Sequence, residues 1–299
     1  MEFSWKYDKA HPQQVKFFLK EKGISKGLLA KIKFQGGMIK VNEHVENVLF
    51  SLSENDMVTI VIPPEGEHET MLLDPTPIDI VFEDEHILVV NKPVGVSSIP
   101  AQYHPNNTMA NRVKNYYKSQ GYEDQVIHVV TRLDRDTSGL MLFAKHGFAH
   151  AKLDTQLREK KFVKKYQALV SGETQSLQEH GEIILPIARD YSSLIKREVA
   201  DTGRYANTEY WLEWEKKKSA LVDIQLHTGR THQIRVHFSA IGCPLLGDDM
   251  YGGRMDLGIS RQALHCYDLQ FYHPFTGEYL MFQQELPEDM QTVSDCLRE

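Results

Sequence analysis

Seven short apolar segments, rich in β-branched and aromatic residues, follow one another in the larger, second part of the chain. They cover residues 78–82, 87–91, 127–130, 140–144, 162–170, 208–214 and 220–226, and this composition is typical of strands. Segments with helical spacing are fewer there, at residues 108–118, 147–159, 231–241 and 287–297. Because strands outnumber helices and do not alternate strictly with them, we expect an α+β domain built on a mixed, mostly antiparallel sheet.

A proline-rich and acidic stretch, PPEGEHETMLLDPTP at residues 63–77, divides the chain of 299 residues. Such a composition is typical of a linker. Before it, residues 15–19 and 27–34 have helical spacing, Ser25 is placed to cap the second helix, and residues 38–42 and 57–62 have the pattern of short strands. We therefore predict a small domain at residues 1–65, a linker at 66–77 and a larger domain at 78–299.

Basic residues gather in two places, although the net charge of the chain is −7. In the small domain Glu21 is the one acid among Lys16, Lys20, Lys22, Lys26, Lys31, Lys33 and Lys40. In the larger domain Glu159 lies among Arg158, Lys160, Lys161, Lys164 and Lys165. A local basic surface can bind phosphate whatever the net charge, so both sets are candidate RNA-binding surfaces. The alternative for each is an ordinary solvated lysine face.

The composition argues against several classes of protein. No run of about 18 apolar residues is present, so a membrane protein is not expected. The first ten residues lack the basic-then-apolar order of a signal peptide. The three cysteines, Cys243, Cys266 and Cys296, are scattered, so neither a disulfide framework nor a paired metal site is expected. A reducing cytoplasm is the simplest compartment.

The stretch VTRLDRDTSGLMLFAK, at residues 130–145, joins a cluster of charges to an apolar strand. Asp136 opens a turn-like DTSG sequence, in which its carboxylate can accept backbone N–H groups and the glycine allows a positive φ. Asp134 has no such local task. Because a carboxylate at the end of a buried strand needs a cationic partner, Asp134 is either half of a structural ion pair or a functional group.

A second cluster, HTGRTHQIRVHFSAIG, covers residues 227–242. Thr231 is placed to cap a helix, on which Ile234, Phe238 and Ile241 form one apolar stripe. Arg235 lies beside that stripe and is placed to reach inward to a buried carboxylate. The three histidines of the cluster recur every five residues, a spacing that puts them on different faces of a helix or a strand, so we expect no metal site.

A third segment, KKFVKKYQALVSG, covers residues 160–172. Read as a strand, it places Phe162, Tyr166, Ala168 and Val170 on one face. Tyr166 would then lie half-buried behind a basic entrance. The alternative is an ordinary core tyrosine.

Six motifs occur in one order along the chain: VVNKPVGV, RLDRDTSGLMLFAK, KKYQALVSG, LHTGRTHQIRVHF, LLGDDMYGG and LHCYDLQFYHPFTGE. Together they resemble the motifs of the RluA/RluD-type pseudouridine synthases, the large-ribosomal-subunit branch. The resemblance implies that Asp134 is the catalytic aspartate, Tyr166 the active-site tyrosine and Arg235 the arginine that pairs with the aspartate. It also implies that Arg132 fills the space left by a flipped nucleotide. The residue before RLD is Thr131, where the family commonly has histidine.

Residues 16–62 also resemble the S4-type RNA-binding domain, through ISKGLLAKIKFQGGMIKVNEHV followed by ENDMVTIVI. Members usually carry a glycine where this chain has Glu43. With both resemblances in place, we predict that a set of basic residues contacts RNA. The set is Lys16, Lys20, Lys26, Lys31 and Lys33 in the small domain, and Lys164, Lys165 and Arg230 in the larger one.

The activity implied by the resemblance is the isomerisation of a uridine in RNA to pseudouridine. We expect 23S ribosomal RNA as the first choice of substrate and tRNA as the second. Uracil leaves the ribose, rotates and reattaches through its carbon 5, after the base has been flipped out of its stack. Nothing is oxidised and no group is imported, so we expect no cofactor, and we expect a monomer. Asp134 either attacks the anomeric carbon or takes a proton from the neighbouring ribose carbon, and the sequence does not choose between these roles.

Two alternatives come from other classes of protein. One is a non-catalytic RNA-binding protein in which the small domain is the active part. The other is a glycosidase that uses Asp134 and Asp136 as its pair of carboxylates.

Overall fold

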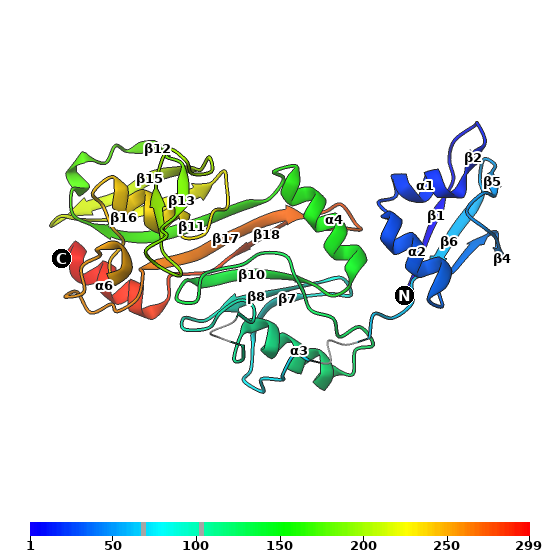
Figure 1. Cartoon of the computed structure of the whole chain (residues 1–299), viewed down its shortest axis with the longest axis horizontal. Helices are drawn as coiled ribbons and strands as arrows, with labels where there is room; N and C mark the ends of the chain where they lie inside the picture. The colour runs from blue at the N-terminus through cyan, green and yellow to red at the C-terminus, as the bar shows by residue number, and fades with distance from the viewer. Residues whose placement is uncertain (67–69, 102–104) are drawn as a thin grey trace.

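The computed structural model of the chain describes residues 1–66, 70–101 and 105–299. Figure 1 shows a small N-terminal unit beyond helix α4, at the end of the molecule opposite the C-terminal helix α6. A long sheet runs between these two ends. Among the helices of the described residues, none combines the length and the apolarity that a membrane crossing requires.

The N-terminal unit is a four-stranded antiparallel sheet covered by two helices. The strands, in spatial order, are β1 (Glu2–Lys6), β6 (Met57–Val61), β3 (Met38–Val41) and β4 (His44–Val45). The helices are α1 (Val15–Glu21) and α2 (Lys26–Phe34), and β2 (Gln13–Gln14) pairs with β5 (Ser51–Leu52). The Leu28 N–H donates to Ser25 Oγ at 3.1 Å, so the predicted cap of the second helix is present. Glu43 has φ 67°, so this turn adopts the left-handed conformation without a glycine.

Within the described residues, the large sheet has ten strands. Its main path is β12 (His180–Ile184), β15 (Asn207–Lys216), β16 (Ser219–Leu226), β11 (Val163–Ser171), β17 (Leu264–Tyr272), β10 (Ser138–Ala144), β8 (Ile87–Lys92) and β7 (Asp79–Glu83). Off this path, β18 (Tyr279–Gln283) pairs with β17 and β9 (His128–Val129) with β10. The β10–β17 pair is parallel and the others are antiparallel. The expected α+β fold with a mixed, mostly antiparallel sheet is therefore confirmed.

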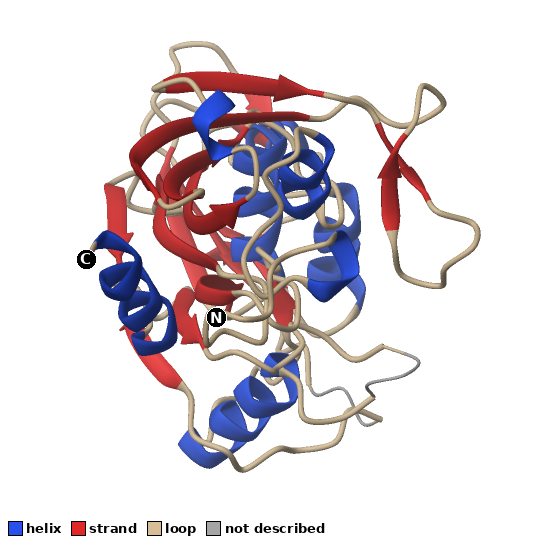
Figure 2. Ribbon diagram, turned by 90° about the vertical axis from the view of Figure 1, so that its left-hand side faces the viewer, coloured by secondary structure: helices blue, strands red, loops and turns tan. Residues whose placement is uncertain are grey.

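Helices cover both faces of the large sheet. Leu88 and Val90 of β8 pack in one cluster with Val113 of α3 (Met109–Gln120). The alternate residues Ile87 and Val89 pack in another cluster with residues of α4 (Gly147–Arg158). This alternation is what a strand buried on both faces requires. The remaining helices are α5 (Gln233–Ala240), α6 (Glu288–Arg298) and the 3₁₀ turns η1 (Thr174–Ser176) and η2 (Asp249–Tyr251). In Figure 2 the strands lie between α6 on one side and other helices on the opposite side.

Gly139 makes the parallel pairing of β10 and β17 possible. It has φ 113°, and a β-carbon there would overlap the backbone of Cys266. No other residue tolerates this conformation and this contact. The glycine of the DTSG sequence is therefore also required at the place where β10 pairs with β17.

The segment predicted as a linker is partly fixed against the larger domain. Residues 67–69 lie outside the described residues. Asp74 forms an ion pair with Arg112 Nε at 3.1 Å, and the Asn111 side chain donates to the Leu72 carbonyl at 2.7 Å. The stretch around residues 72–74 therefore lies along helix α3 and is not a free tether.

The N-terminal unit contacts the rest of the chain through aromatic rings. The Phe3 ring lies 5.0 Å from that of Phe148 on α4 and 4.8 Å from that of Phe275, measured between centroids. Beside them, Glu65 accepts hydrogen bonds from the Gly147 N–H at 3.0 Å and from His128. These contacts define how the unit sits on the end of the large sheet.

Candidate active site

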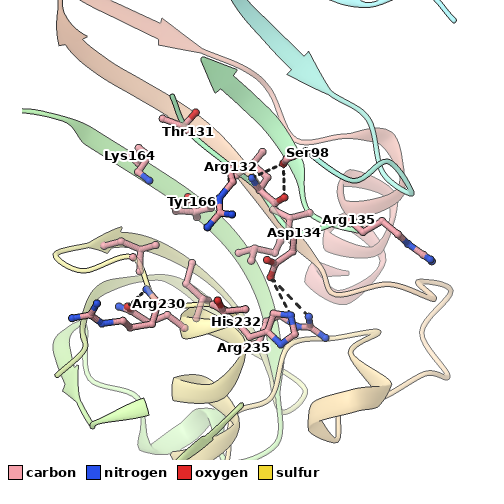
Figure 3. Close-up of a pocket in the computed structure, with 18 of the residues that line it drawn as sticks. Ser98, Thr131, Arg132, Asp134, Arg135, Lys164, Tyr166, Arg230, His232 and Arg235 are labelled. Atoms are coloured by element: carbon pink, nitrogen blue, oxygen red, sulfur yellow. Dashed lines mark hydrogen bonds and ion pairs between the residues drawn. The ribbon is translucent and has the colours of Figure 1, made fainter. Parts of the chain in front are cut away.

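One pocket of about 480 Å³ gathers groups from three of the charged segments. Its walls are the loop before β10, the first half of β11 and the start of α5. Figure 3 shows Arg132 and Asp134 from the first, Lys164 and Tyr166 from the second, and His232 and Arg235 from the third. The volume is in the range of pockets that bind small ligands or a single nucleotide.

The loop that carries Asp134 is held by its neighbours on both sides. The Leu142 N–H donates to Thr131 Oγ1 at 2.9 Å, and Ser98 Oγ donates to the Leu133 carbonyl at 2.6 Å and accepts from the Leu133 N–H at 2.9 Å. Thr131 is buried, so its side chain anchors the backbone of the loop. This fixed loop presents Asp134 to the pocket.

Lys92 holds the other end of the same loop. Its side chain is fully buried, and its ammonium donates to the carbonyl groups of Pro93, Val96 and Arg135 at 2.8, 2.8 and 2.9 Å. Three donors meeting three acceptors satisfy the ammonium group completely. The sequence assigned no role to Lys92 or to Ser98.

Asp134 is the partly exposed carboxylate of the pocket. One third of its side chain is accessible. Its Oδ2 lies 3.9 Å from Arg235 Nη1 and 3.9 Å from His232 Nε2. Both distances are ion-pair distances, longer than a hydrogen bond. The carboxylate therefore faces cationic and donor groups while it remains open to a ligand.

Arg235 has a closer partner than Asp134. Its Nε and Nη2 donate to the two oxygens of Asp248 at 2.7 and 2.8 Å, and the Asp248 side chain is completely buried. Burial acts to lower the pKa of Arg235, but the hydrogen bonds and the charge of Asp248 outweigh it and raise the pKa. The sequence predicted the pairing of Arg235 with an inward carboxylate but missed that Asp248 is the bidentate partner.

Tyr166 is buried in the pocket wall. Burial, followed by the nearby Cys266 and Asp134, raises the pKa of Tyr166 well above its usual value, so the phenol keeps its proton. Lys164 lines the same wall, and burial lowers its pKa. The sequence placed Lys164 on an outer phosphate-binding surface, but the structure places it inside the pocket.

The start of α5 differs from the prediction. His232, not Thr231, precedes the helix, and it has a left-handed backbone with φ 57°. The Gln233 side chain accepts a hydrogen bond from the Arg230 N–H at 3.0 Å. No side chain of the described residues caps the first N–H groups of α5, so the predicted capping role of Thr231 is wrong.

Three arginines of the loop and the helix start, Arg132, Arg135 and Arg230, lie at the edge of the pocket. Arg135 extends away from the pocket in Figure 3 and pairs with Asp136 at 3.1 Å. The turn itself is closed by the Thr137 N–H, which donates to the Asp134 carbonyl at 3.1 Å. Arg132 is exposed at the pocket mouth, and Arg230 Nε donates to the Tyr205 carbonyl at 3.0 Å.

The predicted lysines of the N-terminal unit lie on its helices α1 and α2, which Figure 1 shows beyond α4, apart from β10 and β11. Lys20, Lys26 and Lys33 are exposed. Lys16 and Lys33 lie over the rings of Phe17 and Phe34, at 4.9 and 4.7 Å from the centroids. Lys31 forms an ion pair with Glu65 at 3.2 Å. Lys165 is half-buried on β11. In the strand register it lies opposite Gln225 of β16 and Asp268 of β17.

The described residues contain no group of three or more histidine, cysteine, aspartate or glutamate side chains that could hold a metal ion. Among the described residues, those that line the pocket offer one carboxylate, a phenol, an imidazole, hydroxyl groups and several cations.

Comparison with known proteins decides which chemistry this is. The model of the RNA pseudouridylate synthase family matches residues 86–240, which include the loop, β11 and α5. The RNA pseudouridine synthase YjbO of Bacillus subtilis is 45% identical over 93% of this chain and 97% of its own length. This chain belongs to the RNA pseudouridylate synthase family.

The names of other relatives of this chain place it in the large-ribosomal-subunit branch of the family. The ribosomal large subunit pseudouridine synthase D of Zymomonas mobilis is 38% identical over 85% of this chain and 83% of its own length. The solved structure of human RNA pseudouridylate synthase domain containing 4 aligns with a TM-score of 0.59 and 24% identity, over 74% of this chain and 93% of that chain, which supports the fold. The chain is thus an isomerase of the RluA/RluD type that acts on RNA, and the glycosidase and the non-catalytic binding protein are set aside.

Proposed function

We propose that this pseudouridine synthase modifies a uridine of 23S ribosomal RNA and that Asp134 is the carboxylate that reacts. The observation that carries the proposal is the position of Asp134. It is partly exposed in the pocket, it faces the guanidinium of Arg235, and Tyr166 lies in the adjacent wall. A carboxylate that faces a guanidinium and stays open to a ligand is suited to either role that the reaction offers.

The pocket supports a division of roles between its walls. A uridine flipped into it leaves a gap in the RNA stack, and Arg132, exposed at the mouth, is placed to fill that gap. Asp134 then attacks the anomeric carbon or removes the ribose proton beside it. The uracil rotates against Tyr166 and bonds to the ribose through carbon 5, which breaks the bond to Asp134 or is followed by return of the ribose proton. The hydrogen of carbon 5 leaves to water, and nitrogen 1 takes up a proton. Because Tyr166 holds its own proton strongly, we assign it to stacking on the base and not to removing that proton.

We choose ribosomal RNA as the substrate because of the names of the relatives. Several proteins named ribosomal large subunit pseudouridine synthase D match most of this chain. The exposed lysines of the N-terminal unit suit a long, structured RNA, because only such an RNA can reach that unit and the pocket together. Transfer RNA is the second candidate for the same chemistry.

We further propose that residues 1–65 form an RNA-binding domain of the S4 type, that 66–77 join it to the catalytic domain at 78–299, and that Lys16, Lys20, Lys26, Lys31, Lys33, Lys164, Lys165 and Arg230 contact RNA. A monomer in the cytoplasm, working without a cofactor, is the form that we expect to act on ribosomal RNA.

Labelled substrates test the choice of RNA. Transcripts of 23S rRNA and of a tRNA set, tritiated at carbon 5 of uridine, are incubated with the enzyme, because pseudouridine formation releases this tritium to water. We expect release from 23S rRNA. Release from tRNA alone would replace the ribosomal substrate by the second candidate, and release from neither RNA would contradict both.

A further inference from the structure

His232 and Tyr251 form a buried pair in and behind the pocket wall, and the roles proposed above do not use it. His232 Nδ1 lies 2.8 Å from the Tyr251 hydroxyl, and the two rings meet edge to face with centroids 5.7 Å apart. The other ring nitrogen, Nε2, points to Asp134 Oδ2 at 3.9 Å. In Figure 3 the imidazole stands beside Arg235 below the carboxylate. The pair therefore connects the reacting carboxylate to the protein interior.

The hydrogen bonds of Tyr251 determine which nitrogen of His232 carries the proton. In the described part of the chain, the partners of the Tyr251 hydroxyl are the Arg197 N–H, which donates to it at 2.9 Å, and His232 Nδ1. Burial raises the pKa of Tyr251, so the phenol hydrogen is present and needs an acceptor. His232 Nδ1 is that acceptor. The neutral imidazole then has its own hydrogen on Nε2, the nitrogen that faces Asp134.

The backbone of His232 supports a role for its side chain in the pocket. A residue with a β-carbon adopts a φ of 57° only at some cost. Capping of α5 does not explain it, because the His232 side chain makes no capping hydrogen bond. This backbone conformation directs the imidazole of His232 between Tyr251 and Asp134.

We propose that His232 is a positioning residue for Asp134. Its Nε2–H, fixed in place by Tyr251, donates to one oxygen of the Asp134 carboxylate when a flipped nucleotide fills the pocket and the 3.9 Å gap closes. The second oxygen is thereby aimed at the ribose. This inference rests on the proposed function, because it gives His232 a task only if Asp134 is the reacting group.

Two substitutions at position 232 separate positioning from packing. The amide nitrogen of glutamine reaches the place of Nε2, whereas that of asparagine reaches only the place of Nδ1. We expect His232→Asn to lower kcat by on the order of 10- to 100-fold with little change in KM, as for the loss of a hydrogen bond to a charged group. We expect His232→Gln to recover most of that loss. The readout is single-turnover tritium release from 23S rRNA.

The pH dependence of kcat gives a second readout that packing alone would not move. The charged groups that face His232 are Asp134, Arg235, Arg197 and Asp248. Tyr251→Phe removes the donor to Nδ1, which stabilised the neutral ring. The ring then takes up a second proton at higher pH, its positive charge makes the Asp134 carboxylate a weaker nucleophile or base, and the acidic limb of kcat therefore moves to higher pH. In His232→Gln the imidazole no longer titrates, and the acidic limb moves to lower pH.

The outcomes separate this inference from the proposed function. Superimposed pH profiles, or an asparagine variant as active as the glutamine variant, would overturn the role of His232 while Asp134→Asn stays inactive. Tritium release by Asp134→Asn at the wild-type rate would instead overturn the proposed function, and this inference with it.

Discussion

Asp134, Tyr166 and Arg235 lie far apart in the sequence, and the structure brings all three to one pocket. Their segments were recognisable because each places a charge or a phenol beside an apolar pattern. Asp248 and Lys92 were not recognised. Each lies in one of the six motifs, LLGDDMYGG and VVNKPVGV, but its role comes from a partner elsewhere in the chain, Arg235 for one and the Arg135 carbonyl for the other. Sequence spacing does not reveal such partners.

The ion pair of Arg235 makes the first prediction. We expect Asp248→Asn to lower the free energy of unfolding by about 3 kcal/mol, because it leaves a buried guanidinium without its counter-charge. Asp134→Asn is the matched control. Since Asp134 is one third exposed and lies 3.9 Å from Arg235, its loss should cost less than about 1 kcal/mol. Urea unfolding measures both, and equal destabilisation would show that Arg235 depends on the two carboxylates alike.

At the scale of elements, the predicted strands and helices of the large domain are present with shifted ends. The strands β12, β17 and β18 were missed, as were the short strands β13 (Ile187–Arg189) and β14 (Arg197–Val199). β17 reads LHCYDLQFY, in which His265 and Asp268 interrupt the apolar pattern although both are buried. The Ser138 hydroxyl pairs with His265 at 2.9 Å, and two glutamine side chains donate to Asp268. Polar residues paired inside a central strand therefore hide it from a search for apolar alternation.

Helix α4 makes the second prediction, because a histidine caps it. His146 Nδ1 accepts the Ala149 N–H at 3.3 Å, and its Nε2 lies 3.0 Å from His86 Nδ1. Burial, followed by the charge of His86, lowers the pKa of His146 to about 3. In the unfolded chain a histidine titrates near pH 6.5. Between these values the unfolded state binds a proton that the folded state does not, so stability falls as pH falls from about 6.5 towards 3, at up to about 1.4 kcal/mol per pH unit.

His146→Asn tests this, because asparagine also caps helices but does not titrate. We expect the variant to have a shallower dependence of unfolding free energy on pH in that window. The slope that remains reflects other histidines whose pKa is lowered by burial, such as His86 and His265. An unchanged slope would show that His146 is not the group that titrates.

At the scale of the whole molecule, the sequence predicted two units but not how they meet. The interface depends on Phe3, in a strand that the sequence did not reveal, and on Phe275, almost the whole chain away. Two rings that are so far apart in the sequence produce no local sequence pattern, although they are in contact in the structure. The interface ties the unit that carries α1 and α2 to α4, and the proposed binding of one RNA by both units depends on that contact.

The lysines make the third prediction. We expect the double substitution Lys20→Gln, Lys33→Gln to weaken binding of a 23S rRNA fragment and to make the dependence of log affinity on log salt shallower by about 2, close to one for each phosphate that is no longer neutralised. Lys217→Gln with Lys218→Gln, on the exposed turn between β15 and β16, is the matched control and should leave the slope unchanged. If both double variants kept the wild-type slope, the lysines of the N-terminal unit would be an ordinary solvated face.

The central claim is that Asp134, and not its neighbour Asp136, carries the chemistry. The most direct measurement compares tritium release from 23S rRNA by Asp134→Asn and Asp136→Asn. Both substitutions keep the side-chain shape and remove one charge from the same loop. We predict no detectable release by Asp134→Asn at unchanged RNA affinity, and release within about tenfold of the wild-type rate by Asp136→Asn, because the exposed pair of Asp136 with Arg135 contributes little. Equal loss in the two variants, or activity in Asp134→Asn, would contradict the account.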